Sequence, residues 1–214
     1  MKKLLFIISL CLIAAQSSQD PNRFRQEVDK LIATNQSVSR EKLIMFTGSS
    51  SIKMWNNLKE SFPKHNVVNM GFGGSDMSEL LYFTDELITS FAPKQVFIYE
   101  GDNDIAKGKK ADEILASADS IVNKIRQKLP DVPLVFISAK PSVRRWELRT
   151  EYQDYNKALK AWTQKQNNVR FADVWTPMLK KDGNVREDLF IEDKLHMNEK
   201  GYQIWKQVLR KFLI

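Results

Sequence analysis

A serine triplet, one histidine and a nearby aspartate are the residues of this chain whose types could perform nucleophilic chemistry. Ser49, Ser50 and Ser51 follow an apolar run that ends in Thr47-Gly48, and a helix-like pattern begins directly after them. A tight turn between a strand and a helix can hold a hydroxyl group out for reaction, as a nucleophilic serine requires. The triplet therefore offers a nucleophile if a base can reach it.

The chain has two histidines, and one of them is placed to act as that base. His65 precedes the second predicted strand, at the other end of the sheet, where we expect a solvated turn residue. His196 precedes the last predicted helix, and Asp193 lies three residues before it. A carboxylate at this spacing can bind the imidazole Nδ1–H and leave Nε2 free to accept a proton. A surface Asp–His pair is the alternative interpretation.

Two turns could supply hydrogen-bond donors to a developing oxyanion. The segment GFGGSD places Gly74 just before a predicted helix start, where open backbone N–H groups and the helix dipole favour negative charge. The segment GDND contains Asn103, whose side-chain amide can donate a hydrogen bond. A plain glycine turn and an Asx turn or helix cap are the alternative interpretations.

Other site chemistries fit the chain less well. The one cysteine, Cys11, lies in the N-terminal apolar run, so cysteine catalysis is not expected. Neither GFGGSD nor GDNDIAKGKK has the spacing of a dinucleotide-binding or phosphate-binding loop. Asp102, Asp104 and Asp193 leave open a metal-dependent hydrolase, which would lose activity in EDTA. We otherwise expect no metal and no organic cofactor.

Short apolar runs and intervening helical patterns describe the scaffold that must position these residues. The runs cover residues 42–48, 66–71, 95–101, 133–140 and 169–175. Several are continuously apolar, as in parallel strands covered on both faces. Helical patterns cover 22–35, 51–62, 75–91, 111–129, 147–166 and 198–213. This alternation predicts a flavodoxin-like, doubly wound α/β fold, with three α/β/α layers around about five parallel strands. Such folds bind ligands beyond the carboxyl ends of the strands, where the candidate segments lie.

The N-terminus differs in character from the rest of the chain. Residues 1–18 contain two lysines, then an apolar run, then small polar residues, which is the layout of a cleaved secretory signal peptide. We therefore expect one domain over 19–214 that is secreted or periplasmic, with no stable membrane insertion after cleavage. The net charge of +7 is spread along the chain and does not indicate a nucleic-acid partner.

Four short blocks occur in order: GSSS, NMGFGGS and GDND at the ends of the first three predicted strands, and DKLH before the last helix. In these blocks the chain resembles the SGNH, or GDSL-type, hydrolase superfamily, and within it the branch related to platelet-activating factor acetylhydrolase. The resemblance runs from about residue 42 to the C-terminus. It implies a triad of Ser50, His196 and Asp193. It also implies an oxyanion hole that includes Gly74 and Asn103.

Two positions depart from the family's usual residues. Ser49 stands where an acidic residue is common, and Met197 stands where a proline often follows the histidine. Neither change removes a catalytic group. The first raises the question of which groups form hydrogen bonds around Ser50.

The resemblance implies a serine esterase that works through an acyl-enzyme. The KPSVRRW segment should border the site, where Arg144 or Arg145 could contact a leaving group and Trp146 could stack on a sugar ring. A solvated basic turn is the alternative interpretation. We expect short, acetyl-type esters of carbohydrates or small molecules as substrates. Phospholipid or lysophospholipid acyl esters, and a catalytically silent relative that binds carbohydrate, stay open as alternatives.

Overall fold

The computed structural model describes residues 20–214, so the expected signal peptide lies outside the described residues. Five parallel strands form one sheet in the order β2-β1-β3-β4-β5. They are β1 Ile44–Gly48, β2 Val67–Gly71, β3 Gln95–Tyr99, β4 Leu134–Ile137 and β5 Val169–Ala172. Each strand lies within one of the predicted apolar runs, and the prediction of a flavodoxin-like parallel sheet is confirmed.

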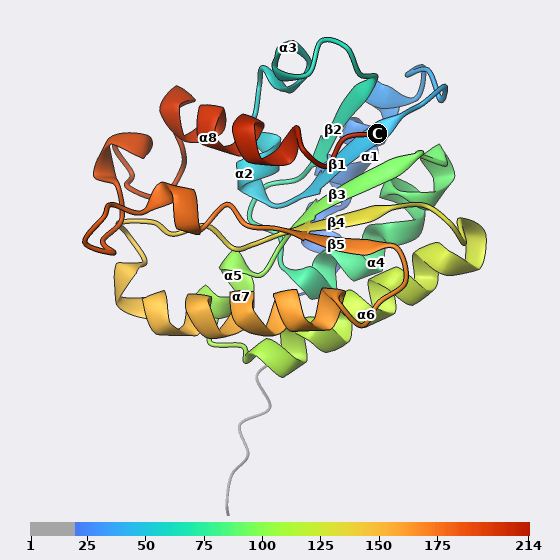
Figure 1. The fold of residues 1–214 in the computed structure, drawn as a ribbon. Helices are drawn as coiled ribbons and strands as arrows, with labels where there is room; N and C mark the ends of the chain where they lie inside the picture. Colours follow the sequence, from blue (N-terminus) through green and yellow to red (C-terminus); the bar gives the residue numbers. More distant parts are fainter. Residues whose placement is uncertain (1–19) are drawn as a thin grey trace, which may run out of the picture.

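Helices cover both faces of this sheet. The longer ones are α1 Arg25–Asn35, α4 Met77–Leu87, α6 Ala111–Lys128, α7 Arg149–Thr163 and α8 Glu199–Leu209. The shorter ones are α2 Ser50–Lys53, α3 Leu58–Ser61 and α5 Asp102–Ala106. Figure 1 shows α4, α6 and α7 on one face and α2, α3 and α8 on the other. The three-layer α/β/α arrangement is therefore confirmed as well.

Two layers of apolar side chains explain why the strands read as continuous apolar runs. Met45 and Phe136 point into the layer beneath α4, α6 and α7. Phe46 and Phe97 point to the opposite face, where their rings stack with centroids 4.3 Å apart. Successive side chains of a strand point to opposite faces of the sheet. A strand covered on both faces therefore needs apolar residues on both, which gives a continuous apolar run.

The segment after β1 corrects one expectation. The prediction of a single helix over 51–62 is wrong, because the chain forms α2 and α3 with a turn between them. Trp55 lies in that turn with its ring buried in the core. The Asn69 side chain of β2 donates to the carbonyl group of Ile52 at 2.7 Å. In an unbroken helix that carbonyl would accept from the Asn56 N–H, but here it accepts from the Trp55 N–H at 2.9 Å and from Asn69, which favours ending α2 there.

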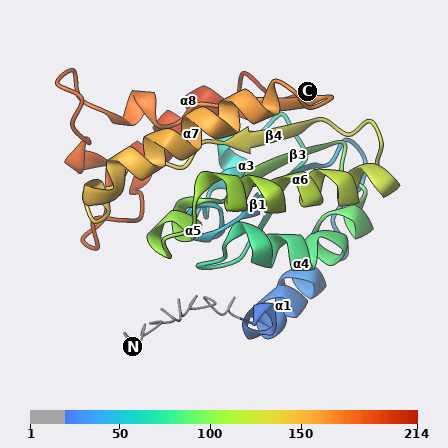
Figure 2. The same ribbon diagram turned by 90° about the horizontal axis from the view of Figure 1, so that it is seen from below.

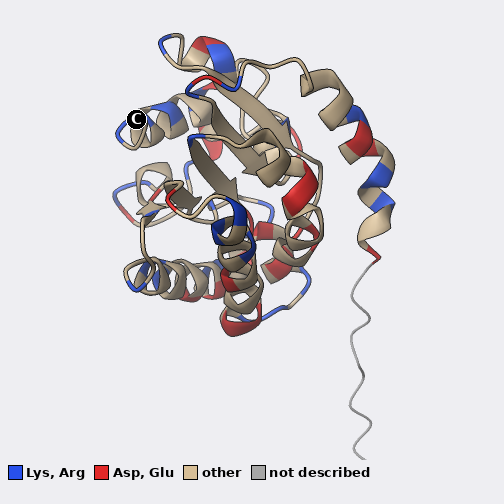
Figure 3. Cartoon of the chain, turned by 90° about the vertical axis from the view of Figure 1, so that its right-hand side faces the viewer, with Lys and Arg blue, Asp and Glu red and all other residues tan. Residues whose placement is uncertain are grey.

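The helix α1 lies beside α4, at the border of one helical layer (Figure 2). Figure 3 shows acidic and basic residues interspersed over the described elements rather than segregated by sign. Within residues 20–214, no helix has the length and apolar character needed to cross a lipid bilayer.

Candidate active site

Ser50, His196 and Asp193 come together at the carboxyl edge of the sheet. Ser50 begins α2 directly after β1, and His196 belongs to the loop before α8. His196 Nε2 lies 3.0 Å from Ser50 Oγ, and Nδ1 lies 2.5 Å from Asp193 Oδ2. Because a carboxylate only accepts, Nδ1 carries the hydrogen, and Nε2 presents its lone pair to the serine. His65 lies before β2, at the other edge of the sheet.

The aspartate side chain also builds the loop that presents the histidine. Asp193 Oδ1 accepts hydrogen bonds from the backbone N–H groups of Leu195 and His196, each at 2.9 Å. Burial raises the pKa of Asp193, but the hydrogen bonds from His196 outweigh that effect and lower it to about 2. The carboxylate is therefore ionised at neutral pH, when it can stabilise an imidazolium.

The three serines of the triplet occupy different environments. Ser49 is buried, and its Oγ accepts a hydrogen bond from Asn103 Nδ2 at 2.7 Å. Ser51 is buried within α2, and only Ser50 is half-buried with its hydroxyl at the histidine. The turn depends on Gly48, which has φ +123° and would place a Cβ atom 2.0 Å from the carbonyl oxygen of Tyr99. These contacts answer the question raised by Ser49, because its hydroxyl binds Asn103.

The glycine loop, residues 71–76, and Asn103 lie next to Ser50. Asn103 Nδ2 donates to the backbone carbonyl of Ser75 at 2.8 Å, as well as to Ser49. The Asn103 side chain thus links Ser49, which precedes Ser50, to Ser75, which follows Gly74. Within residues 20–214, the backbone N–H groups of Ser50 and Gly74 donate no hydrogen bond. Gly74 has φ +75°. An added Cβ would meet no atom within 4 Å, so the space beside its Cα is open.

The helix α1 contacts the glycine loop, a feature that the sequence analysis did not anticipate. Glu27 Oε1 accepts a hydrogen bond from the Gly73 N–H at 2.9 Å and pairs with Lys53 Nζ at 2.9 Å. Arg23, in the short 3-10 turn just before α1, donates to the Gly74 carbonyl at 3.3 Å and pairs with Glu79. Nothing in the local pattern of residues 22–35 indicates these contacts, because their partners lie more than twenty residues away.

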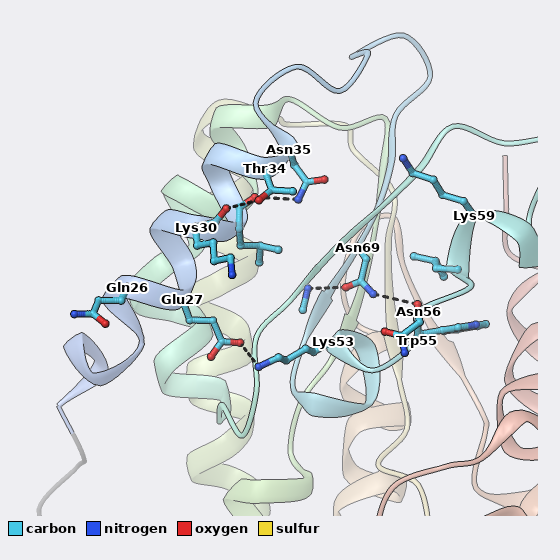
Figure 4. Close-up of a pocket in the computed structure, with 13 residues that line it drawn as sticks. Gln26, Glu27, Lys30, Thr34, Asn35, Lys53, Trp55, Asn56, Lys59 and Asn69 are labelled. Atoms are coloured by element: carbon cyan, nitrogen blue, oxygen red, sulfur yellow. Dashed lines mark hydrogen bonds and ion pairs between the residues drawn. The ribbon is translucent and has the colours of Figure 1, made fainter.

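A cavity of about 660 Å³ lies beside these contacts, between α1, the turn after α2 and β2, the edge strand of the sheet. In Figure 4, Glu27 and Lys53 point toward one another across it. Neither Ser50 nor His196 lines it. The cavity therefore reaches Gly71 of the glycine loop but not the catalytic side chains.

The three residues expected to bind substrate differ in their surroundings. Arg144 has an exposed side chain. The Arg145 side chain instead donates to the Asp102 carboxylate and, at 3.0 Å, to Asn103 Oδ1. The Trp146 ring stacks on Trp175, with centroids 6.0 Å apart. Two of the three are thus engaged with other side chains of the protein.

The aspartates considered for a metal site do not converge. Each has its own partner: Asp102 pairs with Lys140 and Arg145, Asp104 with Lys109, and Asp193 with His196. Over the part of the chain that the structure describes, no group of three or more His, Cys, Asp or Glu side chains could hold a metal ion.

Residues 44–204 match the family model of the GDSL-like Lipase/Acylhydrolase family, which is most of the chain. The chain belongs to this family. The sequence-based predictions of a GDSL-type hydrolase and of a carboxylic ester hydrolase are confirmed. A search of curated proteins found no match.

Solved structures share the fold of this GDSL-family chain. A Streptococcus pneumonia protein named provisionally for platelet activating factor is 22% identical with a TM-score of 0.79, over 90% of this chain and 95% of that one. A GDSL-like lipase from Bacteroides thetaiotaomicron is 18% identical with a TM-score of 0.76, over 91% of this chain and 98% of that one. A variant of an acetyl-xylooligosaccharide esterase from Geobacillus is 17% identical with a TM-score of 0.67, over 83% of this chain and 96% of that one.

Proposed function

We propose that this GDSL-family chain is an exported serine esterase that removes acetyl or other short acyl groups, above all from carbohydrates. One observation carries the proposed chemistry: the hydrogen-bonded path from Asp193 through His196 to the Ser50 hydroxyl. This path is what a serine needs to become a nucleophile at neutral pH.

The first half of the reaction forms an acyl-enzyme. Ser50 Oγ attacks the ester carbonyl carbon while His196 Nε2 accepts the hydroxyl proton. The carbonyl π electrons move to the oxygen, which receives hydrogen bonds from the N–H groups of Ser50 and Gly74. The Asn103 amide exchanges one of its resting hydrogen bonds for a third contact to this oxygen. His196 then protonates the leaving alkoxide oxygen as the ester C–O bond breaks.

The second half returns the free enzyme. Water attacks the acyl carbon while His196 takes one of its protons, and the same donors stabilise the second oxyanion. The bond to Ser50 Oγ breaks, His196 returns the proton to that oxygen, and a carboxylic acid leaves. Throughout, the ionised Asp193 orients the imidazole and stabilises its charged form.

The proposed substrate class is supported by fold similarity and an exposed arginine, and the proposed export by the composition of the N-terminus. The fold is shared with an acetyl-xylooligosaccharide esterase and with a carbohydrate esterase from Talaromyces cellulolyticus. Arg144 has an exposed side chain, available to a polar leaving group. Residues 1–18 have the composition of a signal peptide. Fractionation and N-terminal sequencing of the mature protein test export, and we expect the mature chain to begin near residue 19.

The esterase proposal is tested by hydrolysis of p-nitrophenyl acetate with wild type and Ser50→Ala. We expect Ser50→Ala to lose on the order of 10⁴-fold or more in kcat. Ser51→Ala is the matched control and should keep its activity, because Ser51 is buried and the hydroxyl at His196 Nε2 is that of Ser50. Equal rates for wild type and Ser50→Ala would overturn the proposal and favour the silent carbohydrate-binding relative. Loss of wild-type activity in EDTA would favour a metal-dependent hydrolase.

The substrate class is tested by a series of p-nitrophenyl esters of increasing acyl length, run beside acetylated sugars. We expect kcat/KM to fall steeply beyond the acetyl ester, with activity on the sugar acetates. A preference for long acyl chains would contradict the carbohydrate assignment and favour phospholipid or lysophospholipid esters.

A further inference from the structure

A group of polar side chains surrounds the carboxylate of Asp102, which begins α5 immediately before Asn103. The Asp102 carboxylate accepts hydrogen bonds from the hydroxyls of Tyr99 and Tyr152 and from the cations of Lys140 and Arg145. These five residues form the Asp102 cluster. Burial alone would raise the pKa of Asp102, but the two cations outweigh it and hold that pKa below its usual range. The carboxylate is therefore a fixed negative charge inside the protein.

Arg145 connects this cluster to Asn103. Its Nη1 also donates to the backbone carbonyl of Asp102 at 3.1 Å, while Nη2 donates to Asn103 Oδ1 at 3.0 Å. A guanidinium has donors and no acceptor, so only the oxygen end of the Asn103 amide can face it. The Nδ2 end must then face Ser49 and Ser75, on the side of Ser50 and the glycine loop.

We propose that Arg145 is a positioning residue that acts through Asn103, and that it does not bind substrate. It fixes which end of the amide faces the oxyanion. Its charge also draws electron density from the amide oxygen, which makes the Nδ2–H groups stronger donors. Because Asp102 holds the guanidinium in place, the donor is oriented before the reaction begins. This proposal rests on the proposed esterase function and assigns a supporting residue to the Asn103 donor of its oxyanion hole.

Arg145 is also the member of the cluster that can be tested separately. Lys140 is fully buried and donates to the carbonyl of Leu195 at 2.9 Å, immediately before His196. Changes at Asp102 or Lys140 would therefore disturb the histidine loop and the oxyanion side together. Arg145 makes its side-chain bonds to Asp102 and Asn103, on the oxyanion side.

The test is a double-mutant cycle on p-nitrophenyl acetate hydrolysis, with Arg145→Met made in the wild type and in Asn103→Ala. In the wild type we expect Arg145→Met to lower kcat about 10- to 100-fold with little change in KM, since a donor weakened in the transition state costs less than a donor removed. In Asn103→Ala, the same change should lower kcat less than about threefold, because the group it acts on is gone.

Arg126→Met is the matched control for a structural effect. Arg126 also donates to backbone carbonyl groups, including that of Val132 at 2.6 Å, but it lies at the amino ends of the strands. This control should lower the melting temperature and leave kcat unchanged. If Arg145→Met does not fold, Arg145→Lys replaces it in the same cycle, because lysine keeps the charge near Asp102 but cannot bridge to Asn103.

Two results would overturn the role assigned to Arg145. One is an equal loss of kcat in both backgrounds, which would mean that Arg145 acts independently of Asn103. The other is a raised KM with unchanged kcat, the result expected of a residue that binds substrate. The esterase function has a separate criterion: it fails if Ser50→Ala matches the wild type, whatever the cycle shows.

Discussion

Asp193 performs two tasks with two oxygens, and a single substitution separates them. In Asp193→Asn, the Oδ1 atom can still accept from the backbone of Leu195 and His196, so the loop should keep its shape. The amide nitrogen would replace Oδ2, which lies 2.5 Å from His196 Nδ1. Two donors cannot bond, so the imidazole would shift its hydrogen to Nε2 and could no longer accept from Ser50. We expect kcat to fall about 10³- to 10⁴-fold.

Steady-state kinetics with p-nitrophenyl acetate, together with circular dichroism to verify folding, measures this effect. A loss below tenfold in a folded Asp193→Asn variant would show that the carboxylate is not needed to orient His196.

Gly74 has a backbone conformation that favours glycine, although there is space for a side chain. A residue with a side chain at φ +75° costs about 1 kcal/mol of stability, although the added Cβ meets nothing within 4 Å. We expect Gly74→Ala to lower both the melting temperature and kcat, since relief of the strain would turn its N–H away from the oxyanion. Gly183→Ala is the control, because Gly183 has φ +84° and equally open surroundings in an exposed turn. Loss of stability in both variants, with unchanged kcat in both, would contradict a role for the Gly74 N–H.

At the scale of elements, α1 contacts the glycine loop although it precedes the first strand. In Glu27→Ala, the Gly73 N–H loses its acceptor, which lies 2.9 Å away. A hydrogen bond of this kind contributes about 1 kcal/mol, so we expect a fall in kcat of roughly fivefold. Glu27→Gln keeps an acceptor oxygen and should restore most of the rate, although it loses the charge opposite Lys53.

Asp29→Ala is the matched change on the same helix. Asp29 forms an exposed ion pair with Arg25 rather than with a residue of the glycine loop, and its loss should leave kcat unchanged. If Asp29→Ala and Glu27→Ala lower kcat equally, α1 contributes general stability and does not position the loop.

At the scale of the whole molecule, Glu100 makes stability depend on pH. Burial raises the pKa of Glu100 well above its ordinary value, and Asp104, Asp76 and Glu79 add to the effect. An unfolded glutamate ionises near pH ~4.3, so the folded state holds a proton that the unfolded chain has lost. This contribution to the free energy of unfolding is full below that pH and is lost as pH rises through the folded pKa. Glu100→Gln cannot ionise and should flatten this decline.

Urea unfolding of wild type and Glu100→Gln at several pH values above 4.3 measures the difference. The variant should gain stability relative to the wild type as pH rises. Glu60→Gln removes the same charge from an exposed position of α3 and should leave the slope unchanged. Parallel curves for wild type and Glu100→Gln would show that Glu100 is ionised in the folded protein.

Much of the scaffold was predictable from local patterns. Short apolar runs located all five strands of the sheet, and the helical pattern over 75–91 located α4. The single helix over 51–62 was not correct, because Asn69 of another strand binds the Ile52 carbonyl. Local spacing reports on hydrogen bonds within a segment, and it carries no information about a side chain that arrives from elsewhere.

The sequence by itself determined the order of the strands and helices, the family, and the residues at the carboxyl ends of the strands, because periodicity and short motifs are local properties. Only the tertiary structure decided which of these residues meet. It brings Ser50 into hydrogen-bond contact with His196, 146 positions away. It also directs the Arg145 side chain to Asp102 and Asn103. Such contacts depend on where the sheet order and the packing of each layer bring distant loops together, and no spacing along the chain encodes them.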